Sequence, residues 1–327
     1  MPKQDFSDPN AVQKQRAQME QRTSALGPAP TGVSESRHSI PMRDGYKSEL
    51  KIHRPSSSGT EHPLIVLAFG GGFMMGSNDQ LTPYARSLVR LYDAVVVNLS
   101  YRLAPEHPWP AAQHDSWDAV AWLAENAASD VIGADPRKGF VLGGISAGGN
   151  VAAVVAQMSL KKGSELKYPL TGVWACIPVV VPDASVLPDE EKDLWFSRTQ
   201  NANVPMLDAE AVERIGKMLK PDVRSEWYSP WNAEKPFVGM PRTYVQVDGM
   251  DPLRDDGLIY ERCLKKAGVE TKLTVWPGLP HGHFAFVPML EVSKKANLET
   301  MMGLGWLLRK EVSVHDVVKV LAPPAGA

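Results

Sequence analysis

The 327-residue chain has few cysteines and no long apolar run. Its longest apolar segments, such as GVWACIPVVV, are much shorter than the roughly 20 residues of a membrane-spanning helix. The N-terminal MPKQDFSDPN lacks the apolar core of a signal peptide. The two cysteines, Cys176 and Cys263, fall in predicted strand or helix, so we interpret them as free, buried thiols, with a disulfide as the alternative. These features predict a cytoplasmic protein without a membrane span.

The chain also lacks an excess of charge of either sign, since its formal net charge is -2. It therefore has no basic field for binding nucleic acid and no strongly acidic character. Apolar residues make up 43% of the chain and charged residues 22%, which is typical of globular proteins. This length can bury a substantial core in one large domain or two smaller ones. We expect a small molecule as the partner.

From about residue 36, predicted strands alternate with helix-like stretches, which is typical of a doubly wound α/β fold. The helix-like stretches are TPYARSLVRLY, PAAQHDSWDAVAWLAENA, AGGNVAAVVAQMSLKKG, PLRDDGLIYERCLKKAG and LEVSKKANLETMMGLGWLLRKE. Several strands are apolar throughout, as expected when helices cover both faces of a parallel sheet. A short RDG turn joins the first two strands, which predicts an antiparallel hairpin at that edge. The sequence thus predicts an eight-stranded, mostly parallel sheet. Its strands are SRHSIPM, SELKIHRP, PLIVLAF, AVVVNLSY, GFVLGGI, GVWACIPVV, RTYVQVDG and TKLTVWPG.

Two segments depart from this alternation. Residues 1–35 are polar, and Asp8 followed by Pro9 predicts the start of a helix that runs to about Leu26. Residues 183–235 hold a helix-like LDAEAVERIGKMLK between loops rich in Pro, Trp and Ser, and are too long for a simple crossover. We therefore predict a core of residues 36–182 and 236–327, with a cap insertion at 183–235 and an N-terminal cap segment at 1–35.

The strongest motif is GGISAGG, residues 143–149, which follows a predicted strand and begins an apolar helix. Gly144, Ser146 and Gly148 fit the G-x-S-x-G pattern, in which a sharp turn lifts the serine hydroxyl above the sheet. The turn brings the residues two before and two after the serine close together, so both must be small. The motif predicts a nucleophilic serine, and the alternative is a chance match in a glycine-rich chain.

A nucleophilic serine needs a base and a carboxylate that orients the base. In this fold the chain order is serine, acid, histidine, and only His281, His283 and His315 follow Ser146. His281 and His283 follow the last predicted strand, where the base is expected, whereas His315 lies in the tail. We choose His281, which lies next to Gly282 in a tight loop, and interpret His283 as structural.

The acid is expected after the strand TYVQV, where four aspartates follow. Asp248 is nearest to the strand end but could cap the turn, and Asp251 precedes a proline and could cap a helix. Asp255 and Asp256 fall in the first turns of the next helix, where carboxylates are favoured in any case. Spacing alone does not decide whether Asp248 or Asp251 is the acid.

Three consecutive glycines, residues 70–72, follow the apolar strand PLIVLAF. Adjacent glycines lose much conformational entropy on folding, so we infer that this segment needs backbone without side chains. Attack of Ser146 on a carbonyl forms an oxyanion, which needs backbone N–H donors that no side chain obstructs. We predict that these glycines supply such donors together with Ala147, and the alternative is an ordinary flexible loop.

Ordered blocks along residues 60–290 resemble the hormone-sensitive lipase family of α/β hydrolases. They are FGGGF, YRLAPEHPWPAAQHD at residues 101–115, GISAGGN, and the acid and base blocks DPLRDDG and PGLPHG. The resemblance implies the α/β-hydrolase fold with a helical cap and no metal or organic cofactor. It also implies Asp251 as the acid and His281 as the base, with oxyanion donors at Gly71, Gly72 and Ala147.

The chain departs from the family pattern at two positions. Phe69 stands where the family has a histidine before the glycines, and Ile145 stands where Asp or Glu is common. In the family that histidine helps to hold the loop, and a phenyl ring offers no hydrogen bond. We therefore expect the loop to be held differently or shaped for an unusual substrate.

The combined features predict a serine carboxylic-ester hydrolase that acts through an acyl-enzyme on esters with a short-chain, apolar or aromatic acyl group. One alternative is a dedicated secondary-metabolism hydrolase or cyclase acting on a particular ester, lactone or thioester. Another is a non-catalytic binding protein, as in the related gibberellin receptors, although those have lost the histidine that His281 keeps here.

By analogy with relatives, a homodimer is expected. Candidate pocket residues, each with a core-packing alternative, are Phe69, Phe73, Met74, Met75, Trp195, Phe196, Trp227 and Trp231.

Overall fold

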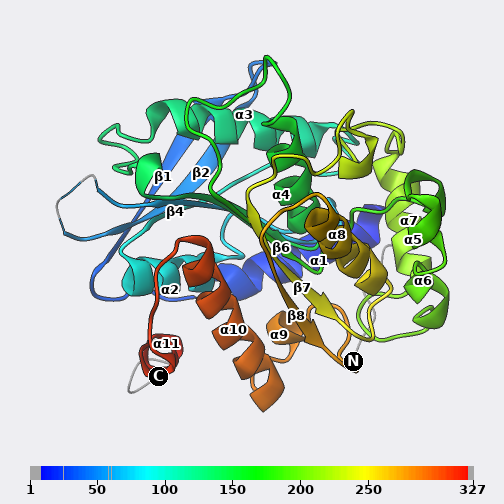
Figure 1. Cartoon of the computed structure of the whole chain (residues 1–327). Coiled ribbons are helices and arrows are strands. Elements are labelled where there is room, and N and C mark those ends of the chain that lie inside the picture. Colours follow the sequence, from blue (N-terminus) through cyan, green and yellow to red (C-terminus); the bar gives the residue numbers. More distant parts are fainter. Residues whose placement is uncertain (1–8, 25, 58, 60, 323–327) are drawn as a thin grey trace.

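A single eight-stranded sheet forms the centre of the molecule (Figure 1). The computed structural model describes residues 9–24, 26–57, 59 and 61–322. The strand order is β1-β2-β4-β3-β5-β6-β7-β8, and every pair from β4 to β8 is parallel. The strands are β1 Val33–Pro41, β2 Lys47–Pro55, β3 Leu64–Ala68, β4 Val95–Asn98, β5 Phe140–Ile145, β6 Gly172–Cys176, β7 Arg242–Asp248 and β8 Thr271–Trp276.

The antiparallel hairpin predicted for the first two strands is confirmed, because β1 pairs antiparallel with β2. β2 is also antiparallel to β4, which separates this edge from the parallel part of the sheet. The apolar strands β3, β4 and β5 are buried along their whole length, as the helical layers on both faces require.

Helices cover both faces of the sheet (Figure 1). One layer contains α3 (Ala111–Asn126), α4 (Ala147–Met158) and α8 (Arg254–Lys266). The other contains α2 (Thr82–Tyr92), α10 (Glu291–Leu307) and α11 (Val314–Leu321). The sequence pattern predicted all of these except α11. A 3-10 turn, η1 (Pro136–Lys138), precedes β5, and the short α9 (His283–Phe286) follows β8.

The segment between β6 and β7 adds further helices at the carboxyl end of the sheet. It contains η2 (Ala184–Val186), α5 (Asp189–Lys192), α6 (Ser197–Gln200), α7 (Ala209–Leu219) and η3 (Pro230–Asn232). The predicted helix LDAEAVERIGKMLK corresponds to α7, which begins where the Asp208 side chain accepts a hydrogen bond from the Ala211 N–H. The N-terminal helix α1 runs from Pro9 to Ser24, and its predicted cap, Asp8, lies outside the described residues.

Both cysteines are free and buried, as the sequence predicted, with Cys176 on β6 and Cys263 on α8. In the part of the chain that the structure describes, no helix combines the length and apolar character needed to cross a membrane.

Candidate active site

Ser146 lies on a sharp turn between β5 and α4. Its backbone has a φ of 57° and a ψ of -114°, a strained conformation for a non-glycine residue. The turn leaves no space for side chains on either side, since a Cβ at Gly144 would lie 2.2 Å from the Gly148 carbonyl oxygen. A Cβ at Gly148 would lie 2.1 Å from the carbonyl oxygen of Ala68. The small residues of the motif are therefore a steric requirement of this turn.

His281 connects Ser146 to Asp251. Nε2 of His281 lies 3.0 Å from Ser146 Oγ, and Nδ1 lies 2.6 Å from Asp251 Oδ2. A carboxylate can only accept hydrogen bonds, so Nδ1 carries the proton and Nε2 accepts from the serine hydroxyl. The other oxygen of Asp251 accepts the Leu253 N–H at 2.8 Å, which fixes the carboxylate. This arrangement can move a proton from the serine to the imidazole.

The surroundings favour a charged imidazole at position 281. Burial lowers the pKa of His281, but the Asp251 carboxylate and its hydrogen bond raise it, and the net shift is upward from 6.5. Asp248 raises this pKa further, while the Arg198 guanidinium opposes the shift. The site therefore stabilises the imidazolium that forms when His281 accepts the serine proton.

The other acid and base candidates have different partners. Asp248 Oδ2 accepts the Gly282 N–H, and His283 lies beside Asp248 Oδ1. Asp255 accepts hydrogen bonds from backbone N–H groups at the start of α6. Asp256 accepts hydrogen bonds from backbone N–H groups in the loop that follows β6. His315 is exposed on α11, as its place in the tail predicted.

The glycine loop lies directly against the serine turn. A Cβ at Gly70 would lie 2.8 Å from the Ile145 carbonyl oxygen and 3.4 Å from Ser146 Cβ. Gly71 and Gly72 have positive φ angles of 130° and 63°. Among the described residues, no hydrogen bond uses the N–H of either glycine. Ala147 is the first residue of α4, so its N–H also precedes the first intrahelical bond. The loop and the helix start thus offer backbone donors beside Ser146.

The structure shows how the loop is held without the histidine that the family has at position 69. The Phe69 ring stacks on Tyr101 with 4.1 Å between the ring centroids and 13° between the planes. The Tyr101 hydroxyl donates to the Phe69 carbonyl at 2.6 Å. Aromatic stacking and a backbone hydrogen bond therefore anchor the strand end from which the glycines begin.

The N-terminal helix provides a second anchor through Arg16. Its guanidinium donates to the carbonyl oxygens of Met74 and Ala104, each at 2.6 Å. It also forms a bidentate ion pair with Glu106, with both contacts at 2.9 Å. The side chain joins α1, the glycine loop and the YRLAPEH segment. The sequence carried no signal for this residue, because nothing in a polar helix identifies which arginine will meet a distant carbonyl.

The candidate pocket residues near the loop are buried. Phe69, Phe73, Met74 and Met75 are each at most 2% exposed and pack in the core. A Cβ at Gly72 would lie 2.8 Å from Cδ1 of Ile215, so α7 lies directly over the glycine loop. Sequence reasoning missed Ile215, although the amphipathic pattern of α7 indicates one face that packs against the protein.

The candidate aromatic residues of the 183–235 segment mainly attach it to the core. Trp227 contacts the rings of His114 and Trp117 on α3, and Trp231 packs against Phe237 and Tyr260. The core-packing alternative therefore describes Trp231, which is buried, whereas Trp227 is half-buried against α3. The Trp195 indole donates to buried Asp256 on α8 at 3.0 Å.

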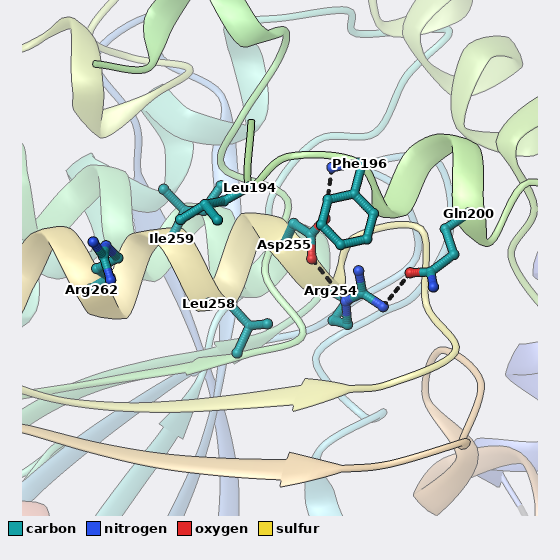
Figure 2. A pocket seen from close by; sticks show the side chains of 8 residues that line it. All are labelled: Leu194, Phe196, Gln200, Arg254, Asp255, Leu258, Ile259 and Arg262. Carbon is teal, nitrogen blue, oxygen red and sulfur yellow. Dashed lines mark hydrogen bonds and ion pairs between the residues drawn. The ribbon is translucent and has the colours of Figure 1, made fainter. Parts of the chain in front are cut away.

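Phe196 lines a pocket of about 330 Å³ between α8 and the α5–α6 segment (Figure 2). Arg254 lies beneath its ring, 5.1 Å from the centroid, and also donates to Gln200. Figure 2 shows the Asp255 side chain between Arg254 and the backbone N–H of Phe196. This pocket does not include Ser146 or His281 in its lining. Its residues are Leu194, Phe196, Gln200, Arg254, Asp255, Leu258, Ile259 and Arg262.

Comparisons with known proteins agree with this fold. A family model described as alpha/beta hydrolase fold matches residues 65–285. A carboxylesterase of Mycobacterium tuberculosis is 34% identical over 267 residues, covering 80% of this chain and 77% of the relative. The versiconal hemiacetal acetate esterase of Dothistroma septosporum is 33% identical over 289 residues, covering 88% and 85%. The solved structure of vibralactone cyclase has a TM-score of 0.83 and 28% identity, covering 91% of this chain and 89% of the other.

The fold and the serine turn define an α/β hydrolase. The chain belongs to the α/β-hydrolase fold family, among the carboxylesterases that resemble hormone-sensitive lipase. It is a serine hydrolase of carboxylic esters.

Proposed function

We propose that Ser146, His281 and Asp251 are the catalytic triad of this hydrolase. The observation that supports it most directly is the continuous chain of contacts, 3.0 Å from serine to histidine and 2.6 Å from histidine to aspartate. Ser146 Oγ attacks the ester carbonyl while His281 Nε2 takes its proton. Asp251 holds the imidazole and stabilises its protonated form.

The reaction then follows from the same groups. The N–H groups of Gly71, Gly72 and Ala147 donate to the oxyanion of the tetrahedral intermediate. His281 returns its proton to the departing alcohol, which leaves an acyl group on Ser146. Water, deprotonated by His281, attacks this acyl-enzyme and releases the acid.

We propose short-chain esters as the substrate class. The position of Ile215 over Gly72 supports this assignment, because an acyl group bound at the glycine loop meets α7 nearby. A relative whose name specifies an acetate ester supports a short acyl group as well.

The proposal is tested by hydrolysis of p-nitrophenyl esters from acetate to decanoate. Wild-type protein should act best on the short chains, and Ser146→Ala and His281→Ala should each lose about 10⁴-fold or more in kcat. His315→Ala is the matched control, because that imidazole is exposed on α11 and touches none of the proposed groups. Loss of fluorophosphonate labelling in Ser146→Ala would identify the nucleophile independently of the ester. Retained labelling or turnover in that variant would contradict the triad.

A second candidate is an acyl transfer to a hydroxyl of the same substrate, which yields a lactone instead of an acid. The similarity to a structure titled vibralactone cyclase favours testing it. A hydroxyacyl ester distinguishes the two outcomes, since hydrolysis gives the hydroxy acid and cyclisation gives the lactone.

We also propose that the chain is divided into a core and two cap segments, at residues 1–35 and 183–235. A cytoplasmic location and a homodimer are proposed as well. Size-exclusion chromatography with light scattering would test the dimer.

A further inference from the structure

A second carboxylate and a second imidazole lie beside the loop that carries His281. Asp248 is the last residue of β7 and is fully buried. His283 is the first residue of α9, and only 1% of its surface is exposed. Neither side chain takes part in the proton chain proposed above. Their burial next to the base suggests a role in holding it.

Asp248 contacts the two residues that follow His281. Its Oδ2 accepts the Gly282 N–H at 2.9 Å, and its Oδ1 lies 3.1 Å from His283 Nδ1. The second contact is close by distance, although the atoms are not aligned as a hydrogen bond. Withdrawing a carboxylate from water costs several kcal/mol unless nearby donors or charges compensate it. The Gly282 N–H and the His283 imidazole therefore offset part of the free-energy cost of burying the Asp248 carboxylate.

Packing keeps the His283 ring in place. Its centroid lies 6.0 Å from that of Trp276 at the end of β8 and 5.4 Å from that of Phe284. Within the described part of the chain, neither of its nitrogens makes an aligned hydrogen bond. Aromatic contacts and the nearby carboxylate thus define the position of this imidazole.

We propose that Asp248 and His283 form a second carboxylate–imidazole pair that positions His281 through the Gly282 backbone. His281 is then restrained from two directions, by Asp251 through its ring and by Asp248 through the next peptide group. Both are positioning residues, since neither touches the serine. The catalytic part of this inference rests on the proposed function.

Electrostatics supplies a readout that packing alone would not change. The titratable and charged groups that act on His281 are Asp251, Asp248 and Arg198, and the Asp248 charge raises the pKa of His281. Burial in turn raises the pKa of Asp248, and His283 opposes that shift. Replacing Asp248 by a neutral side chain should therefore lower the pKa of His281.

The test compares Asp248→Ala, Asp248→Asn and His283→Phe. Asp248→Ala removes the acceptor of the Gly282 N–H and should lower kcat on p-nitrophenyl acetate by about tenfold to a hundredfold, with little change in KM. Asp248→Asn retains an oxygen acceptor and should recover most of kcat. His283→Phe keeps the aromatic packing but removes the nitrogen that faces Asp248, so kcat should also fall.

The pKa of His281 is measured separately by NMR titration, which needs no turnover. It should fall in Asp248→Asn and stay unchanged in the control Asp115→Asn. Asp115 is also a fully buried carboxylate that accepts a backbone N–H, from Arg102, but it lies apart from the His281 loop. Melting temperatures establish that each variant is folded.

The proposed role of the pair would be contradicted by a wild-type kcat in folded Asp248→Ala or His283→Phe. It would also be contradicted by an unchanged His281 pKa in Asp248→Asn. Failure of the proposed function has a different signature, because wild-type protein would then neither hydrolyse the esters nor react with a fluorophosphonate. In that case the NMR titration still decides whether Asp248 acts on His281.

Discussion

Replacing Gly71 by alanine tests the proposed oxyanion site most directly. The backbone at this position has a φ of 130°, a conformation that side chains rarely adopt. An added Cβ would lie 2.4 Å from the Met75 carbonyl oxygen, much closer than any normal contact. Gly71→Ala must therefore shift the loop and displace the N–H that faces the proposed oxyanion.

The expected effect follows from two contributions. Strain at such a position costs about 1–3 kcal/mol, which appears mainly as lower stability. Loss of one oxyanion donor costs about 2.7–4 kcal/mol of transition-state stabilisation, or a factor of about 10²–10³ in kcat. KM should change little, because the oxyanion exists only in the transition state and the intermediate.

The assay is steady-state hydrolysis of p-nitrophenyl acetate, together with the melting temperature of each variant. Gly45→Ala is the matched control, since Gly45 also has a positive φ of 84° but has no neighbouring atom within 4 Å of an added Cβ. It lies in the turn between β1 and β2, outside the candidate site. The control should lose stability and keep its kcat.

A folded Gly71→Ala protein with a kcat close to that of the wild type would refute the assignment. The N–H of Gly71 would then not be an oxyanion donor. A loss of activity of equal size in Gly45→Ala would show that general destabilisation explains the result.

Two further predictions concern the base and the loop anchor. The pKa of His281 is raised above 6.5, and the neutral imidazole is the active form of the base. The value of kcat/KM should therefore fall with decreasing pH through a midpoint above 6.5. Asp251→Asn should move this midpoint to a lower pH. Arg16→Met removes the guanidinium that donates to the Met74 carbonyl, and a loss of about 1.4 kcal/mol in loop ordering would lower kcat about tenfold. Arg214→Met, which removes an exposed ion pair within α7, should leave kcat unchanged on the same ester.

The sequence predicted the parts of the site that depend on local chain geometry. The G-x-S-x-G pattern identified the serine turn, because the close approach of Gly144 and Gly148 excludes side chains in any protein with this turn. The alternating apolar segments likewise predicted the strands and the main helices, including α2 with the bounds that the structure shows. Such features follow from interactions among residues that are near each other in the chain.

Contacts between distant segments could not be predicted in the same way. Spacing left Asp248 and Asp251 open, and only the folded loop shows Asp251 beside His281 and Asp248 beside Gly282. The helices α5 and α6, with four residues each, are too short to show a periodic pattern, and the amphipathic α11 of eight residues was not recognised in the C-terminal segment. The sequence also left each candidate pocket residue with a core-packing alternative, because apolar side chains fit a pocket wall and a core equally well.

The sequence by itself therefore determined the class of fold, the nucleophile turn and the order of the candidate catalytic residues. Only the tertiary structure decided that Arg16 and Tyr101 hold the glycine loop, and that Ile215 lies over it. The physical reason is the range of the interactions. Backbone sterics and periodic burial act over a few residues, whereas these anchors join segments whose proximity arises only when the whole core packs.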